Sequence, residues 1–157
     1  MRIFIPFTKL RVETYTACRR AERRVQLWPI ENYHYGYAEY WIHRWQHGGR
    51  FINVEHDVVP VAEALTEMWH CPEDYCICNY RYPYAGSRID TSPIGCAKFS
   101  AEFIAAHQGI FVHRQYWHEI QYLILNATLN KAHIHEPPAV HLHVQDDWPL
   151  DARKTYE

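Results

Sequence analysis

The segment RFINVEHDVVP (residues 50–60) joins a run of strand-forming residues to a charged cluster. Residues 51–54 are mostly apolar, which is typical of a buried strand. Glu55, His56 and Asp57 follow directly, and a proline then ends the segment. We therefore expect a buried strand that presents two carboxylates and an imidazole at its carboxyl end.

Strand-like and helix-like segments alternate around this stretch. Before it we expect a strand at 2–7, a helix at 12–24, a strand at 24–30 and a helix at 36–49 that ends in two glycines. After it we expect a helix at 61–69, a strand at 75–82, a turn-rich segment at 83–95, a strand end leading into a helix at 96–107, a helix at 117–132 and a strand at 139–144. The alternation over the first seventy residues predicts βαβ units, and hence one α/β domain over residues 1–157 with a mainly parallel central sheet flanked by helices.

Ligands of open α/β sheets bind at the carboxyl ends of the strands, where Glu55 and Asp57 are expected. If the extended geometry continues past residue 54, both carboxylates lie on one side and His56 points to the other. Two carboxylates suit a hard cation such as Mg²⁺ or Mn²⁺, and such a cation suits phosphate oxygens. The alternative is that these polar residues mark the end of a strand entering solvent.

Histidines form the second unusual feature. Four of the twelve lie in two H-x-H pairs, His133 with His135 and His141 with His143. In a strand each pair projects both imidazoles to one face, which is the arrangement a metal site needs. For any single histidine, a role in the core or on the surface is the alternative.

The five cysteines are an odd number and indicate a reducing compartment rather than a disulfide framework. Cys71, Cys76 and Cys78 lie near His70, and this group could hold zinc. Paired C-x2-C spacings are absent, so small buried side chains are the favoured interpretation.

The overall charge of −2 offers no electrostatic footprint for nucleic acid or an anionic membrane. The apolar runs are far shorter than the ~20 residues that span a bilayer, and the N-terminus lacks the apolar region of a signal peptide. We expect a cytoplasmic protein.

Among the aromatic residues, Tyr37, Trp41 and Trp45 are expected in the core, whereas alternating tyrosines at 80–84 suit either the core or a platform for a sugar.

Several segments resemble the family-2-like glycosyltransferases of the GT-A fold. Residues 36–60 are similar to the part of that family in which a helix leads through a glycine-bearing turn into a strand ending in D-x-D, with E-x-D here. RIFIPFT (2–8) looks like its first strand and GCAKFSAEF (95–103) like its glycine loop. WHEIQYLIL (117–125) resembles the helix that carries an E-D pair, and KAHIHEPPAVHLH (131–143) resembles its terminal strand with a metal-binding histidine.

The resemblance implies a metal-dependent glycosyltransferase that moves a sugar from a nucleotide-sugar donor to an unknown hydroxyl acceptor. It implies Mn²⁺ or Mg²⁺ as the cofactor, with the metal ligands Asp57, Glu55, and His141 or His143. It also implies donor contacts at Pro6, Thr8, Glu55, Asp57 and Gly95. Glu119 would act as the catalytic base if the reaction inverts configuration.

The chain departs from the family pattern in two acids. Glu55 replaces the first acid of the D-x-D motif, and the E-D pair is reduced to Glu119. The chain is also short for this fold, so a partner chain or a homo-oligomer could supply acceptor-binding elements. Two other functions stay open: a metal-dependent hydrolase, and a non-catalytic binding or assembly protein that retains the fold.

Overall fold

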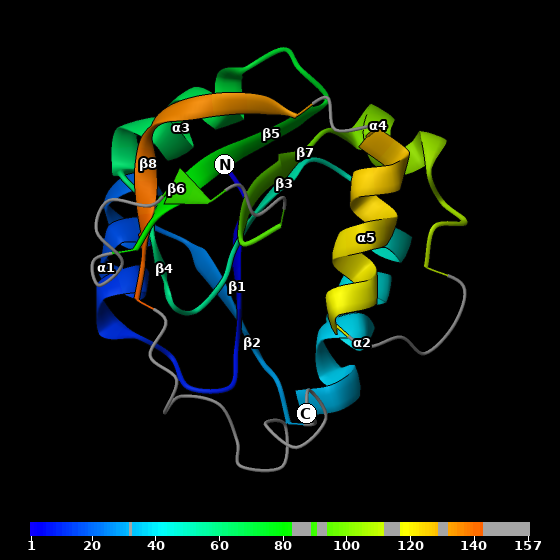
Figure 1. Cartoon of the computed structure of the whole chain (residues 1–157), viewed down its shortest axis with the longest axis horizontal. Coiled ribbons are helices and arrows are strands. Elements are labelled where there is room, and N and C mark those ends of the chain that lie inside the picture. Colours follow the sequence, from blue (N-terminus) through cyan, green and yellow to red (C-terminus); the bar gives the residue numbers. More distant parts are fainter. Residues whose placement is uncertain (32, 83–88, 91–93, 112–116, 129–131, 143–157) are drawn as a thin grey trace.

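The computed structural model describes residues 1–31, 33–82, 89–90, 94–111, 117–128 and 132–142. Within these residues, eight strands form one sheet with helices on both faces (Figure 1). The strands are β1 (Ile3–Phe7), β2 (Val25–Pro29), β3 (Phe51–Val54), β4 (Val58–Val59), β5 (Tyr75–Arg81), β6 (Ile89–Asp90), β7 (Cys96–Phe99) and β8 (His133–His141). The helices are α1 (Val12–Ala21), α2 (Tyr33–His47), α3 (Ala62–His70), α4 (Ala101–Ala106) and α5 (Trp117–Thr128).

The sheet is mixed, so the prediction of a mainly parallel sheet is wrong. Its strand order is β2-β1-β3-β7-β5-β8-β4, and β6 pairs with β5. β1 is parallel to β2 and β3, and β5 is parallel to β8. β7, however, is antiparallel to both β3 and β5, and β4 is antiparallel to β8.

The connection between β5 and β7 explains this difference. The first three long strands are linked by helices, as the alternation predicted. The segment from β5 to β7 is the predicted turn-rich one, and its described residues contain the short strand β6 but no helix. Antiparallel neighbours need only a turn between them, whereas parallel neighbours need a long crossover.

Each face of the sheet has its own core. Helices α2, α4 and α5 cover one face, and α1 and α3 cover the other (Figure 1). The first core is aromatic and includes Tyr37, Trp41 and Trp45, which confirms their assignment to the interior. The second is built from aliphatic and sulfur-containing side chains such as Leu65 and Met68.

Two glycines set the entry into β3. Gly48 and Gly49 have φ angles of +59° and +80°, a backbone region that favours glycine. The amide of Gly48 donates to the carbonyl of Trp45 at 3.2 Å, and α2 ends there as the sequence predicted. The chain can then turn directly from α2 into β3.

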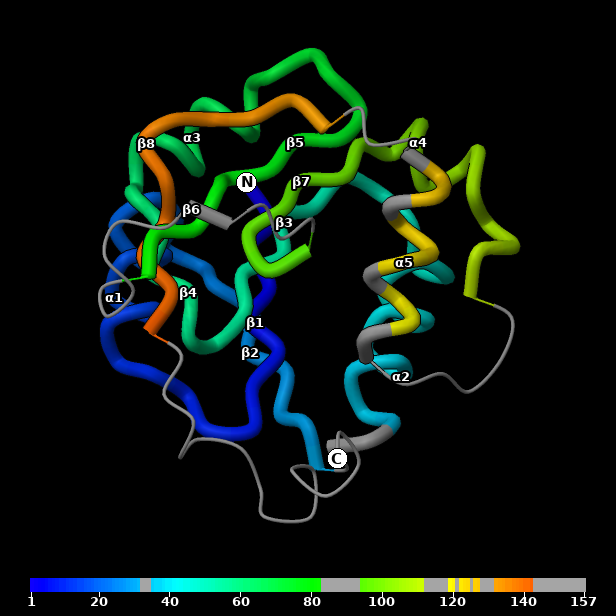
Figure 2. The backbone as a smooth tube through the Cα atoms, in the orientation of Figure 1, coloured from blue at the N-terminus to red at the C-terminus, as the bar shows by residue number. Residues whose placement is uncertain are grey.

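Strand β8 follows β5 along its length (Figure 2). It begins at His133, six residues before the predicted start at 139, because residues 133–138 also pair or bulge along β5. His135 lies opposite Cys78 and Ala139 opposite Tyr80, with an irregularity between these pairs. The histidines of β8 are therefore spread along one long strand.

None of the described helices is long and apolar enough to cross a membrane.

Candidate functional site

The two carboxylates after β3 lie in a turn. β3 ends at Val54, and the amide of Val58 donates to the carbonyl of Glu55 at 3.0 Å. The extended geometry expected past residue 54 is therefore wrong, although His56 does point elsewhere. Its Nδ1 lies 3.0 Å from the hydroxyl of Tyr37 on α2.

Pairing between β4 and β8 brings His141 to this turn. Val58 lies opposite His141 in the antiparallel ladder, and the amide of Leu142 donates to the carbonyl of Asp57 at 2.7 Å. The imidazole Nε2 of His141 then lies 3.3 Å from Oδ2 of Asp57. The strand β4, which the sequence did not reveal, is thus the element that sets this contact.

Glu55, Asp57 and His141 form the acidic cluster. One ligand atom from each lies within 4.8 Å of the others. Asp57 is only 8% exposed. Burial, with a further contribution from the charge of Asp57, raises the pKa of Glu55 to about 8. Carboxylate oxygens and one imidazole nitrogen at this spacing are suited to hold a divalent cation such as Mn²⁺ or Mg²⁺.

Aromatic rings pack against the histidine of the acidic cluster. The ring of Tyr80 stacks on His141 with centroids 5.0 Å apart, and Tyr82 contacts the same imidazole edge-on. Tyr80 is 1% exposed and belongs to the core rather than to a sugar platform. Tyr82 is half-buried, and Tyr84 lies outside the described residues.

Gly95 leaves the space in which this packing forms. A methyl group at Gly95 would lie 1.5 Å from the hydroxyl oxygen of Tyr80 and 2.8 Å from Oε2 of Glu55. The carbonyl of Gly95 accepts a hydrogen bond from the amide of Glu55 at 2.8 Å. Gly95 therefore touches the acidic cluster, through its backbone and through the room it leaves.

Gly95→Ala is expected to displace Tyr80 and Glu55, and to destabilise the fold by about 1–3 kcal/mol through overpacking. It should also weaken binding of Mn²⁺. Urea unfolding and a Mn²⁺ titration measure the two effects. Gly109→Ala is the matched control, because a methyl group there meets nothing within 4 Å. Unchanged stability and affinity in Gly95→Ala would contradict this account.

A buried asparagine positions the Gly95 segment. Asn53, fully buried in β3, accepts a hydrogen bond from the hydroxyl of Tyr40 at 2.8 Å. Its amide donates to the carbonyl of Ile94 at 2.6 Å. Buried polar groups of this kind are almost always paired, so they fix neighbouring segments in place. Asn53 was not among the predicted site residues, although a single polar residue inside an apolar strand was an available signal.

The predicted donor residues lie at the same edge of the sheet. Pro6 is buried near the end of β1, and Thr8 is half-buried just after it. β1 and β3 are parallel neighbours, with Phe4 opposite Asn53, so their carboxyl ends share one edge. The structure thus places Pro6 and Thr8 at the edge that carries the acidic cluster.

The predicted base Glu119 is not one of the residues of the acidic cluster. Glu119 lies in the first turn of α5, which packs against α2 (Figure 1). Among the residues whose placement is described, Glu119 is not one of the potential metal ligands near Asp57. His143 lies outside the described residues. Within the described ranges, the structure brings His141 to Asp57.

Comparisons with known proteins give one distant structural likeness. No protein-family model matches the chain, and no curated protein matches it. Among solved structures, the chain is similar to the crystal structure of a glycosyltransferase involved in the glycosylation of the major capsid of PBCV-1. The TM-score is 0.49 and the identity 11%, over 93% of this chain and 96% of that chain. A likeness at this level does not define an activity.

Proposed function

We propose that the protein is a metal-dependent glycosyltransferase with an abbreviated GT-A-type fold, related to the family-2-like enzymes. In this proposal it transfers a sugar from a nucleotide-sugar donor to a hydroxyl acceptor. The observation that carries the proposal is the convergence of Glu55, Asp57 and His141 at the carboxyl end of β3. The resemblance implies that the two acids of an E-x-D motif and a histidine of the terminal strand bind one ion. Ligand atoms of Glu55, Asp57 and His141 lie within 4.8 Å of one another, close enough to share an ion.

In the proposed site, Asp57 and His141 hold the ion directly, and Glu55 holds it directly or through a water. The cation, Mn²⁺ or Mg²⁺, supplies positive charge that offsets the negative charge developing on a leaving diphosphate. Partial burial of the acidic cluster keeps these charges in a medium where they interact strongly. Tyr80 stacks on His141 and fixes the orientation of its ring.

The donor is proposed to lie along the edge formed by the ends of β1 and β3. Pro6 and Thr8 would contact it from one side and Gly95 from the other.

Glu119 remains our proposed base for an inverting reaction, in which it would take the proton of the acceptor hydroxyl.

A thermal-shift experiment tests the proposed function. Mn²⁺ and a nucleoside diphosphate together should raise the melting temperature by more than the sum of their separate effects, because phosphate oxygens complete the coordination shell of the ion. Asp57→Ala should remove this synergy. Absence of synergy at millimolar ligand would overturn the proposal.

Metal binding, turnover and self-association separate the two alternative functions from the proposed one. A hydrolase would bind the metal without help from a nucleotide and would turn over a substrate with no acceptor present. A binding or assembly protein would show self-association or a partner, and substitution of surface tryptophans would affect it more than substitution of Asp57.

A further inference from the structure

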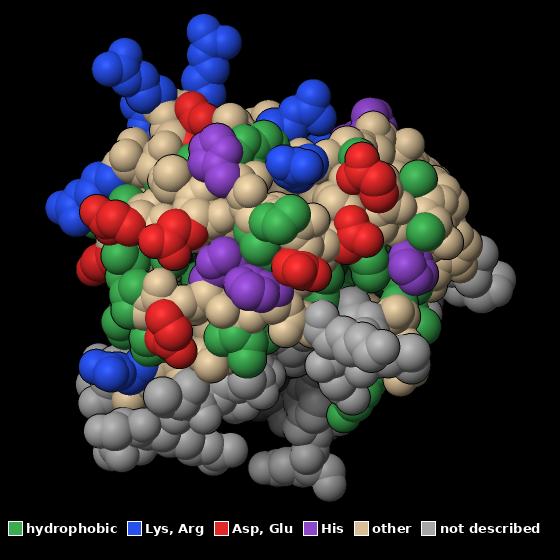
Figure 3. Space-filling model, turned by 90° about the horizontal axis from the view of Figure 1, so that it is seen from above, with side chains coloured by type: hydrophobic (Ala, Val, Ile, Leu, Met, Phe, Trp, Pro, Cys, Tyr) green, Lys and Arg blue, Asp and Glu red, His purple; other side chains and the backbone are tan. Residues whose placement is uncertain are grey.

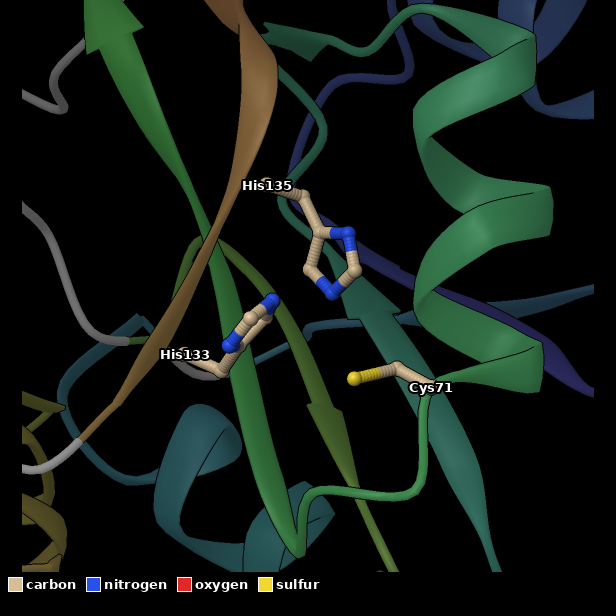
Figure 4. A group of neighbouring side chains, drawn as sticks. All are labelled: Cys71, His133 and His135. Atoms are coloured by element: carbon tan, nitrogen blue, oxygen red, sulfur yellow. The ribbon is translucent and has the colours of Figure 1, made fainter.

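A second group of metal-ligating side chains lies toward the other end of β8. It consists of Cys71, His133 and His135, and we call it the Cys-His cluster. One ligand atom from each lies within 4.8 Å of the others. Figure 4 shows the thiol and both imidazoles directed into one space between β8 and the end of α3.

The fold builds the Cys-His cluster from two elements. His133 and His135 lie opposite Cys76 and Cys78 of β5 and, being two residues apart, point to the same face of the sheet. Helix α3 covers that face and ends at His70, and the amide of the next residue, Cys71, donates to the carbonyl of Glu67 at 2.8 Å. The thiol is thereby fixed beside the two imidazoles.

A buried cation fixes the segment that follows Cys71. Lys98 is fully buried, and its ammonium group donates to the carbonyl of Cys71 at 3.1 Å and also to the carbonyl of Glu73. Hydrogen bonds to a charged group are among the stronger ones in proteins. The backbone that carries the thiol is therefore tied to the sheet by Lys98.

The two ring nitrogens of His135 have different surroundings. Its side chain is 8% exposed, and Nδ1 faces Oε2 of Glu67 at 4.0 Å. Nε2 is buried and has no hydrogen-bond partner among the described residues. Figure 4 shows a ring nitrogen of His135 directed into the space between His133 and Cys71.

A bound ion would account for both nitrogens. A buried nitrogen without a partner costs free energy, and coordination to a metal removes that cost. Histidines that bind metals commonly face a carboxylate through the other ring nitrogen, which orients the ring, and Glu67 occupies that place.

The donor atoms determine the class of metal. A thiolate and two imidazoles are soft to borderline ligands, which suit Zn²⁺ and are poorly suited to Mg²⁺ or Ca²⁺. Three protein ligands leave one position of a tetrahedral zinc ion for water or another small ligand. His133 is exposed and Cys71 is half-buried, so solvent can reach this side of the cluster. Figure 3 shows the face of the molecule seen from above, with histidine and acidic side chains at its surface.

We propose that Cys71, His133 and His135 form a zinc site whose fourth position is open to solvent, and that the ion ties the end of α3 to the start of β8. The site is separate from the acidic cluster: His135 and His141 are six residues apart, up to about 20 Å along an extended strand. It also differs from the zinc group considered from the sequence. Of that group only Cys71 takes part, while the thiol of Cys78 faces the sulfur of Met68 at 3.4 Å.

Titration of the metal-free protein with Co²⁺ and Zn²⁺ tests this proposal. Co²⁺ serves as the spectroscopic probe, because a cobalt-thiolate bond gives charge-transfer absorption in the near ultraviolet. We expect one equivalent of Co²⁺ with that absorption, displaced by Zn²⁺. Cys71→Ser should abolish the absorption. His133→Gln should weaken Zn²⁺ binding by about 100-fold or more, since outer-shell partners alone are worth roughly 10–100-fold.

Three further variants and one structural check act as controls. His70→Gln changes an exposed histidine next to Cys71 that is not in the cluster, so it should leave Zn²⁺ affinity unchanged. The thiol of Cys76 contacts that of Cys71 but is not in the cluster, so Cys76→Ser should retain the charge-transfer absorption through Cys71. Asp57→Asn should also retain it, which separates this site from the acidic cluster and from the proposed transferase activity. His133 is exposed, so its variant should fold, as circular dichroism will show.

Three results would overturn the zinc proposal. One is the absence of charge-transfer absorption in the folded wild-type protein. Another is wild-type affinity for Zn²⁺ in folded Cys71→Ser or His133→Gln. The third is a loss of affinity in His70→Gln as large as that in His133→Gln.

Discussion

Asp57→Asn should lower the affinity of the protein for Mn²⁺ by about 100-fold or more, since loss of an outer-shell partner alone costs roughly 10–100-fold. Asp57 is largely buried, and its carboxylate contacts His141 at 3.3 Å. Asparagine keeps the size of the side chain and one oxygen, but it removes the negative charge that a hard cation requires. Electron paramagnetic resonance of free Mn²⁺ gives the affinity directly, without knowledge of the donor or the acceptor.

His56→Gln is the matched control for Asp57→Asn. His56 lies between the two acids in the sequence, yet its imidazole faces Tyr37, so Mn²⁺ affinity should be unchanged. Glu55→Gln should give an intermediate loss, because its amide oxygen can still serve as a weaker ligand. If Asp57→Asn binds Mn²⁺ as the wild type does, or if His56→Gln weakens binding equally, the acidic cluster is not the Mn²⁺ site.

Trp41→Ala should destabilise the protein by about 3–5 kcal/mol, a large part of the roughly 5–15 kcal/mol that holds a typical domain folded. Trp41 is 1% exposed, and its ring contacts the rings of Phe51, Phe99 and Phe111 at centroid distances of 6.0, 5.6 and 6.4 Å. Alanine would leave a cavity between α2 and the sheet. Urea unfolding gives the free energy, and the melting temperature should fall by about 2–4 °C for each kcal/mol.

Trp28→Ala is the comparison for Trp41→Ala. Trp28 on β2 is half-buried and packs against Tyr40 and His43, so it should cost less. Trp41→Phe should cost less than Trp41→Ala, because phenylalanine fills part of the space. Equal losses of stability in Trp41→Ala and Trp28→Ala would contradict this ranking.

The first part of the fold could be predicted because its signals are local. The period of the apolar residues and the pair Gly48-Gly49 mark α2 and β3, and the helices between the early strands require parallel neighbours. The later part has no comparable signal. The direction of β7 depends on which strands it pairs with, and β4 has only two residues. The prolines in β8 also resemble loop residues, which hid the start of that strand.

The candidate site could be predicted only in part. The E-x-D motif and the H-x-H pair identified Glu55, Asp57 and His141 as residue types suited to a cation, and the fold brings these three together. Whether they bind an ion stays a prediction. The reason for their approach is a turn and a two-residue strand, which no periodicity reveals. The Cys-His cluster could not be predicted from the sequence for a similar reason. The register of β8 on β5 determines which residues lie near Cys71.

The shift of register between β8 and β5 determines which changes in the length of β8 its histidines can tolerate. From His135 to Ala139 is four steps along β8, while their partners Cys78 and Tyr80 are two steps apart on β5. β8 therefore carries two surplus residues there. Because side chains alternate with a period of two, an even surplus preserves which face each histidine occupies. A chain without Pro137 and Pro138 would still direct the histidines at both ends of β8 to the same face, whereas loss of a single residue would turn one end away from its partners.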